Sequence, residues 1–168
     1  IRFEADATYA VQIAAAEIGT GSRTVLTQIA AEALGCPSHC VRMEIGDSGL
    51  PRASNAGGSF GTISWGAAIV AAAEAFRDQH GADPQLGAET EAQAPEVNDD
   101  DRSRHSFGAQ FAEVRINADT GEIRVSRMLG VFSVGRVINP VTARSQFVGG
   151  MTMGVGMALH EHGVMDPR

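Results

Sequence analysis

The chain has 168 residues, 43% of them hydrophobic, which fits one domain or two small lobes with an apolar core. No apolar run in the sequence reaches the roughly 18 residues that cross a bilayer, so we expect no membrane-spanning helix. The formal net charge is −7. Its concentration between Asp83 and Arg104 argues against nucleic acid as a partner, because phosphate binding needs a basic surface.

The first third of the sequence predicts a strand region, a glycine turn, a helix and a second strand. Apolar residues recur at helical spacing in residues 24–34, Gly35 stands where helices are commonly capped, and Pro37 prevents continuation. Strand-like residues precede the turn, and apolar and polar residues alternate regularly after the helix. These strand segments are residues 1–3, 9–13 and 41–45, and the turn is residues 19–22.

A turn-rich segment containing Gly57-Gly58-Ser59 separates this region from a second predicted helix at residues 63–80. That helix is almost continuously apolar as far as Ala75, so we expect it to be buried on most of its surface. The acidic stretch that follows contains Pro84 and Pro95 and few large apolar residues, which is typical of a solvated linker.

The clearest local pattern is a predicted β-hairpin in the last third of the chain. Two alternating segments, residues 111–116 and 122–125, flank a short turn that ends at Gly121. The second strand can continue through residues 131–134. We therefore expect a first lobe at residues 1–80, an acidic linker at 81–105 and a second lobe at 106–168.

A last helix is predicted to begin at Pro140, whose fixed φ suits the first helical position. Residues 146–159 of this helix contain four glycines. Each glycine costs a helix about 1 kcal/mol relative to alanine. We therefore expect another structure to pack closely against this backbone.

Glycine-bearing stretches precede or occupy all three predicted helices, at residues 19–22, 57–61 and 146–156. A glycine turn that leads into a helix exposes backbone N–H groups at the positive end of the helix dipole, where phosphate can bind. No Gly-Lys-Ser/Thr follows, and no Gly-x-Gly-x-x-Gly occurs at a strand–helix junction, so neither nucleotide motif is present. The alternative for each stretch is a tight turn or close helix packing.

Other residues with chemical potential receive an ordinary interpretation. Cys36 and Cys40 lack a second Cys/His pair at metal-binding spacing, so we expect free thiols in a reducing cytoplasm, with an incidental disulfide or a periplasmic location left open. His160 and His162 are two residues apart and therefore point to different helix faces. Glu17 is expected to be a structural or surface carboxylate.

Several motifs together resemble the molybdenum-cofactor subunit of the xanthine dehydrogenase/aldehyde oxidase family. Residues 17–24 and 28–35 match a Glu-x-Gly-x-Gly turn, a helix and an Ala-Glu-x-Leu-Gly ending that occur together in that family. The remaining motifs follow in family order and cover most of the chain outside the acidic stretch. They are Asp47 and Pro51 with Gly57-Gly58-Ser59, residues 106–114 with 119–122, and residues 135–140 leading to Gln146, Gly149-Gly150 and residues 154–156.

This resemblance implies an α/β (α+β) fold of mixed sheets with flanking helices, as in the molybdopterin-binding domain of that family. It also implies that the cofactor is molybdenum-molybdopterin, in its simple or cytosine dinucleotide form. Thr20 stands where many relatives have a glutamine, so its reach toward the cofactor is shorter. The amide of Gln146 can both donate and accept hydrogen bonds. The cofactor-binding residues carried over are Gly19, Thr20, Gly21, Gly57, Gly58, Ser59 and Gln146.

The implied activity is oxidative hydroxylation of a small aldehyde or N-heterocycle. The implied partners are the remainder of the molybdenum subunit and iron–sulfur (2Fe–2S) and FAD subunits or domains, in an oligomeric assembly. The chain shows no leader and reads as cut at both ends, and the family's catalytic glutamate falls beyond the position of Arg168. We therefore assign no catalytic residue and no metal ligand here, and expect this chain alone to be inactive.

The residues leave two other hypotheses open. The chain can be a cofactor-free, non-catalytic remnant of the family, which Thr20 and a short segment at residues 79–103 favour. It can also be a generic phosphate- or nucleotide-binding module built on its two glycine-to-helix turns.

Overall fold

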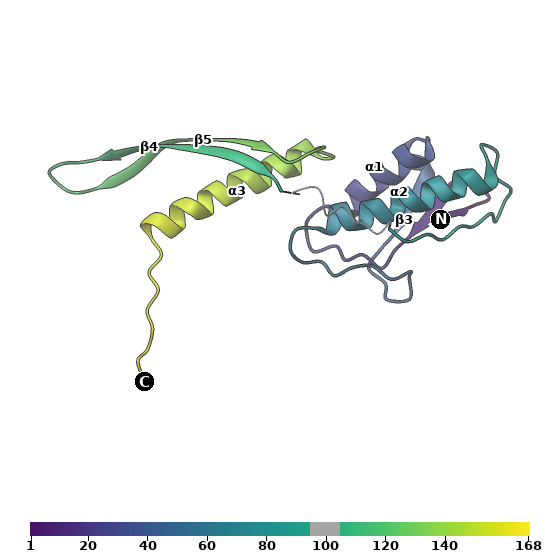
Figure 1. Ribbon diagram of the computed structural model, residues 1–168, viewed down its shortest axis with the longest axis horizontal. Helices are drawn as coiled ribbons and strands as arrows, with labels where there is room; N and C mark the ends of the chain where they lie inside the picture. The colour runs from purple at the N-terminus through teal and green to yellow at the C-terminus, as the bar shows by residue number, and fades with distance from the viewer. Residues whose placement is uncertain (95–104) are drawn as a thin grey trace. The chain divides into compact units, whose positions relative to one another are not determined.

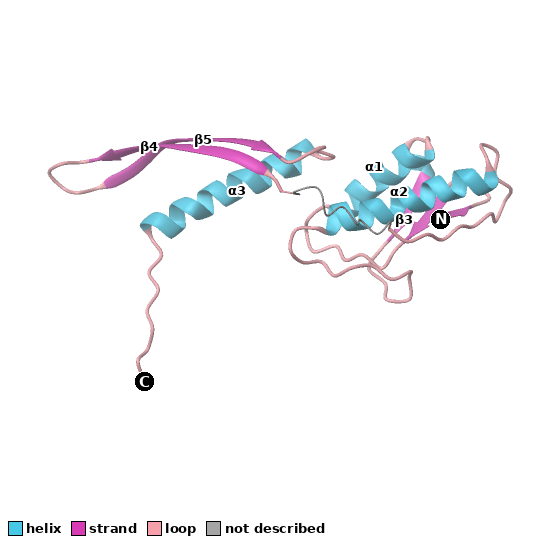
Figure 2. Cartoon of the chain, viewed as in Figure 1, coloured by secondary structure: helices cyan, strands magenta, loops and turns pink. Residues whose placement is uncertain are grey.

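The computed structural model describes residues 1–94 and 105–168 and divides into two compact units, Ile1–Asp99 (unit 1) and Asp100–Arg168 (unit 2) (Figure 1). Both units combine helix with sheet, which confirms the predicted α/β (α+β) class (Figure 2). The elements of unit 1 are β1 (Arg2–Phe3), β2 (Tyr9–Gln12), α1 (Ser22–Leu34), a 3-10 turn η1 (Ser38–Cys40), β3 (Val41–Glu44) and α2 (Gly61–His80). The elements of unit 2 are β4 (Phe107–Ile116), β5 (Ile123–Ser133) and α3 (Pro140–Leu159).

Unit 1 is a mixed three-stranded sheet with helices on one face. The strand order is β1-β2-β3, with β1 antiparallel and β3 parallel to β2. Val11 of β2, Leu26 of α1 and Phe76 of α2 are each at most 2% exposed, and they belong to one apolar cluster. Burial of such side chains contributes about 1.5–3 kcal/mol each, so this face supplies most of the stability of unit 1.

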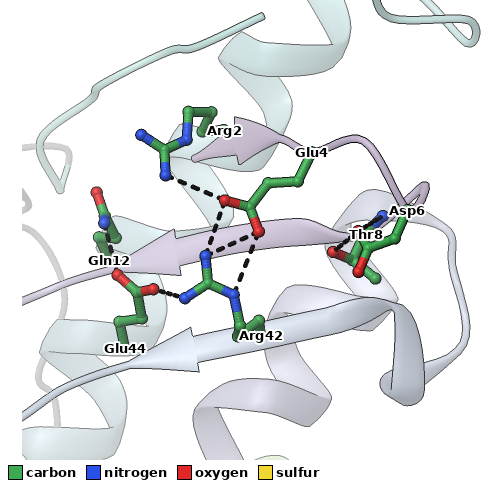
Figure 3. A network of polar contacts seen from close by, with 7 residues as sticks. All are labelled: Arg2, Glu4, Asp6, Thr8, Gln12, Arg42 and Glu44. Carbon is green, nitrogen blue, oxygen red and sulfur yellow. Dashed lines mark hydrogen bonds and ion pairs between the residues drawn. The ribbon is translucent and has the colours of Figure 1, made fainter. Parts of the chain in front are cut away.

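The opposite face of the sheet carries a polar network (Figure 3). The carboxylate of Glu4 accepts hydrogen bonds from Arg2 (3.0 Å) and Arg42 (2.8 Å). Arg42 also pairs with Glu44, which accepts a hydrogen bond from Gln12 at 2.5 Å. Exposed ion pairs of this kind contribute little to stability, so the network mainly keeps this face polar.

The segment after α2 returns to the edge of the sheet. Phe3 N–H donates to the Ala88 carbonyl (2.9 Å) and Thr90 N–H donates to the Ile1 carbonyl (2.9 Å). Thr90 is buried. Part of the stretch expected to be a solvated linker is therefore hydrogen-bonded to β1. Such backbone hydrogen bonds need no apolar side chains, so a polar sequence can form them. Residues 95–104 of that stretch lie outside the described residues.

The hairpin predicted in unit 2 is confirmed. Strands β4 and β5 pair in antiparallel fashion over their whole length, with one irregularity between Glu113 and Val114. In the connecting turn, the side-chain oxygen of Asn117 accepts from the N–H groups of Asp119 and Thr120, and Gly121 has a φ of 71°. The second strand continues to Ser133, as expected.

Helix α3 begins where the sequence predicts and contacts the hairpin. Asn139 caps it by accepting hydrogen bonds from Val141 N–H (3.1 Å) and Thr142 N–H (3.2 Å). The rings of Phe132 on β5 and Phe147 on α3 stack 4.2 Å apart. None of the 20 residues of α3 is buried, so within unit 2 the hairpin leaves the helix mostly uncovered.

The glycines of α3 do not meet the close neighbour that the sequence led us to expect. A Cβ atom placed on Gly149, Gly150 or Gly154 has nothing within 4 Å among the described residues. Within unit 2, the expectation of close packing against this backbone is therefore wrong.

Candidate functional site

Both predicted glycine loops of unit 1 begin at the same end of the sheet, where the parallel strands β2 and β3 terminate. Strand β2 leads through the first loop into α1, and strand β3 leads through the second loop into α2. Because β2 and β3 are parallel, both loops start at their carboxyl ends. Backbone bonds from Ala14 N–H to the Pro51 carbonyl (2.7 Å) and from Gly46 N–H to the Ala15 carbonyl (2.8 Å) tie the loops together. Ligands of open α/β sheets bind beyond the carboxyl ends of the strands.

The first loop is organised by Glu17. One carboxylate oxygen accepts hydrogen bonds from Gly19 N–H (2.9 Å) and Gly21 N–H (3.0 Å), and the other accepts from Arg23 N–H (3.1 Å). Desolvation acts to raise the pKa of Glu17, but these backbone hydrogen bonds hold it below its ordinary value. The amides that the sequence suggested for the cofactor thus donate to a carboxylate of the same chain.

Gly19 and Gly21 have φ values of 93° and 75°, and a Cβ atom on either would meet nothing within 4 Å. These glycines are therefore required by backbone conformation and not by a close neighbour in the chain. Between them, the hydroxyl of Thr20 lies 2.9 Å from the hydroxyl of Ser22. Because one of these hydroxyls donates to the other, the pair keeps one O–H for a further acceptor.

The second loop, Gly57-Gly58-Ser59, differs from the first at the start of its helix. Gly58 and Ser59 both have left-handed φ values, 65° and 57°. A Cβ atom on Gly58 would lie 2.9 Å from the ring of Phe60, so the turn is also tight. Phe60, at the N-cap of α2, makes no side-chain capping bond, and the first turn of α2 contains no acidic residue. Neither its N-cap side chain nor an acidic residue of its first turn therefore offsets the positive end of the dipole of α2.

A groove of about 940 Å³ adjoins the second loop. Its walls include Gln12 at the end of β2 and Trp65 on α2, whose indole N–H donates to the Ser54 carbonyl (3.0 Å). Neither glycine loop lines it, but Asn55 does, and Asn55 lies against Gly57. The groove is thus next to the loop predicted to contact the cofactor.

Gln146 is carried by the other unit, where it is exposed on α3 beside Phe147. In unit 1, the segment with Gly19, Thr20 and Gly21 leads from β2 to α1, and the segment with Gly57, Gly58 and Ser59 leads from the parallel strand β3 to α2. Gln146 belongs to unit 2, so it is not brought to these loops within one unit. Its amide is open to a ligand.

The residues given an ordinary interpretation contain no second site in the part of the chain that the structure describes. Cys36 and Cys40 are free thiols, and burial raises the pKa of Cys36. Within residues 1–94 and 105–168, no cluster of three or more His, Cys, Asp or Glu residues is arranged to hold a metal ion. The helices described there are also too short or too polar to span a membrane.

Comparison with known proteins places these features in a family. The family model for the molybdopterin cofactor-binding domain matches residues 1–82 and 80–168. The chain belongs to this molybdopterin-binding family, in the xanthine dehydrogenase/aldehyde oxidase group. It is 34% identical to the aldehyde oxidoreductase molybdenum-binding subunit PaoC of Escherichia coli K12 over the whole chain, and 31% identical to the probable hypoxanthine oxidase XdhD of the same strain over 99% of it.

This chain spans only about a quarter of those relatives, 27% of PaoC and 21% of XdhD. A more distant relative, the carbon monoxide dehydrogenase large chain of Hydrogenophaga pseudoflava, is 27% identical over 84% of the chain. The alignment with PaoC extends over 198 residues, although this chain has 168, so PaoC has at least 30 residues here without a counterpart. The two family-model matches overlap at residues 80–82. These residues lie within the segment predicted to be short, residues 79–103.

Proposed function

We propose that this chain forms part of the molybdopterin site of a molybdenum hydroxylase, which oxidatively hydroxylates a small aldehyde or an N-heterocycle. The observation that carries the proposal is the match of the molybdopterin-binding model across the chain. PaoC is named an aldehyde oxidoreductase and XdhD a probable hypoxanthine oxidase, so the names of these relatives include both substrate classes.

The two glycine loops are proposed to contact the cofactor in different ways. At the second loop, Gly57 and Gly58 lack side chains that would obstruct the pterin, and Ser59 adds a hydroxyl next to the open end of α2. At the first loop, the Thr20 hydroxyl is the available donor, while Gly19 and Gly21 provide the backbone conformation. The amide of Gln146 is proposed to bind the edge of the pterin.

When bound, the cofactor, in its simple or cytosine dinucleotide form, supplies the redox chemistry. The chain supplies orientation and hydrogen bonds. No residue is assigned as catalytic base, and we propose that the 168 residues alone are inactive. We also propose a cytoplasmic assembly that includes the remainder of the molybdenum subunit and iron–sulfur and FAD partners. The hairpin and α3 are uncovered within unit 2, and we propose that other parts of the enzyme cover them.

A substitution in the complete enzyme tests the Gln146 contact. We expect Gln146→Ala to lower molybdenum and pterin content by up to about tenfold with the fold retained, because the loss of one hydrogen bond lowers affinity by up to about that factor. Ser145→Ala, at the exposed neighbouring position, is the matched control. Metal analysis and pterin fluorescence after oxidation measure both. Unchanged content in the Gln146 variant would show that the contact is wrongly assigned.

A cofactor-free remnant is the second candidate. It is favoured by the hydrogen bonds of Glu17, which occupy two amides of the first loop and one of α1, and by the residues present in PaoC but not here. Molybdenum and pterin in equal amounts in the purified enzyme would rule it out. Binding of mononucleotides without pterin would instead support a nucleotide-binding module.

A further inference from the structure

Glu17 makes an unusual set of bonds for a residue that precedes a helix. Its acceptor oxygens bond to N–H groups two, four and six residues further along the chain. Two of these donors, Gly19 and Gly21, belong to the loop, and only Arg23 belongs to the body of α1. Gly21, the N-cap residue of α1, has no side chain that could cap the helix. The carboxylate therefore holds the loop at least as much as it caps the helix.

Two consequences follow for a ligand at this edge of the sheet. Hydrogen bonds to a carboxylate are stronger than neutral ones, so the loop is held in the conformation that presents Thr20. The carboxylate also occupies the positive end of α1, where it would repel a phosphate.

We infer that Glu17 is a positioning residue of the cofactor site: it shapes the Gly19–Gly21 turn around the Thr20 hydroxyl. This inference rests on the proposed function and assigns the first loop a side-chain contact. It also gives Glu17, which the sequence indicated only as a structural or surface carboxylate, a role in cofactor binding.

The test compares four variants in the complete enzyme. Glu17→Gln keeps the size of the side chain but turns an N–H group toward one of the three donors. Glu17→Asp keeps the charge but is shorter; Asp47 in this chain bonds only to the N–H group two residues ahead, so the variant should retain the Gly19 bond and lose the Arg23 bond. Glu74→Gln, on the exposed side of α2, is the charge control.

Gly35→Ala is the stability control, because it strains the far end of α1 without touching the loop. Two quantities are measured for each variant. Amide hydrogen exchange in residues 19–23 of the cofactor-free enzyme reports the shape of the loop. Molybdenum and pterin content after expression reports the binding of the cofactor.

We expect Glu17→Gln to speed exchange in residues 19–23 about tenfold, the equivalent of one lost hydrogen bond, and to lower cofactor content by up to about the same factor. Glu17→Asp should fall between this variant and the wild type. Glu74→Gln and Gly35→Ala should keep full cofactor content. Loss of content in Gly35→Ala equal to that in Glu17→Gln would show that Glu17 acts only through stability and would overturn the inference.

Two further outcomes separate the inference from the proposed function. Faster exchange with unchanged cofactor content in Glu17→Gln, or unchanged exchange, would overturn the positioning role and leave the proposed function standing. Absence of molybdenum and pterin from the wild-type enzyme itself would overturn both.

Discussion

In unit 1 the ring of Phe76 is 1% exposed, whereas in unit 2 the rings of Phe107 and Phe111 are 64% and 61% exposed. The difference extends to whole elements: α2 buries six residues and α3, of equal length, buries none. Both helices are similarly apolar in sequence, so composition alone does not explain the contrast. The difference is that unit 1 has a further helix, α1, beside α2, whereas the described part of unit 2 has no second helix beside α3.

The hairpin of unit 2 shows where a second layer is missing. Side chains alternate between the two faces of a strand, so Phe132 on the α3 side implies that Leu129 and Val131 lie on the other. Phe111 is paired with Leu129 across the strands and shares that face. Two-stranded hairpins are marginally stable by themselves. We therefore expect unit 2 to depend on further protein, and unit 1 to be stabilised by its own core.

The largest expected effect is on the core of unit 1. Phe76→Ala should lower the free energy of unfolding by about 3–5 kcal/mol, because it removes a fully buried ring. Denaturant unfolding of the chain can be followed by the fluorescence of Trp65, its single tryptophan, which is buried in unit 1.

Phe111→Ala is the matched control in unit 2. It should change the Trp65 transition by less than about 0.5 kcal/mol, as exposed substitutions usually do. An equal loss in both variants would mean that the two units share a core, and the comparison between them would fail.

A pair of glycine substitutions sharpens the same comparison at intermediate size. Gly35 caps α1 with a φ of 71°, so Gly35→Ala should cost unit 1 about 1–2 kcal/mol through left-handed strain. Gly149 lies within α3, and a Cβ atom there would meet nothing within 4 Å among the described residues of unit 2. Gly149→Ala should instead favour the helix by about 0.5–1 kcal/mol and so raise the helix content of the isolated chain. Denaturant unfolding measures the first change and far-ultraviolet circular dichroism the second. A loss of helix in Gly149→Ala would indicate that something already packs on that glycine.

Much of the fold could be predicted because its boundaries are marked by residues with local effects. Gly35, Gly121 and Pro140 fix the end of α1, the hairpin turn and the start of α3 through their own backbone preferences. The return of residues 87–90 to β1 was not predicted, because main-chain hydrogen bonds leave no side-chain pattern. The exposure of α3 was not predicted either, because an apolar sequence does not show which protein covers it.

The positions of the two glycine loops were predictable, and the assignment of their residues to a cofactor stays a prediction. The glycines of both loops could be found from their spacing, and their common edge follows from the parallel strands. The role of Glu17 could not, because its three donors converge only once the loop has its shape. A glutamate two residues before the first glycine was the one available signal. Gln146 remains a prediction from the family motif.

The smallest expected effect concerns Glu17 and depends on pH. The folded chain lowers the pKa of this carboxyl below its ordinary value near 4.5, so the folded state favours the charged form. The resulting stabilisation is present above the unfolded pKa and is lost as the pH falls through the folded pKa. Because Glu17 is exposed, solvent screening keeps this stabilisation below about 1 kcal/mol. Glu17→Gln should therefore unfold more easily than the wild type at pH 7, and the two should converge as the solution is acidified. Glu74→Gln, the control, should match the wild type at every pH. If Glu17→Gln is still less stable than the wild type in acid, then lost packing, and not the carboxylate charge, destabilises the loop.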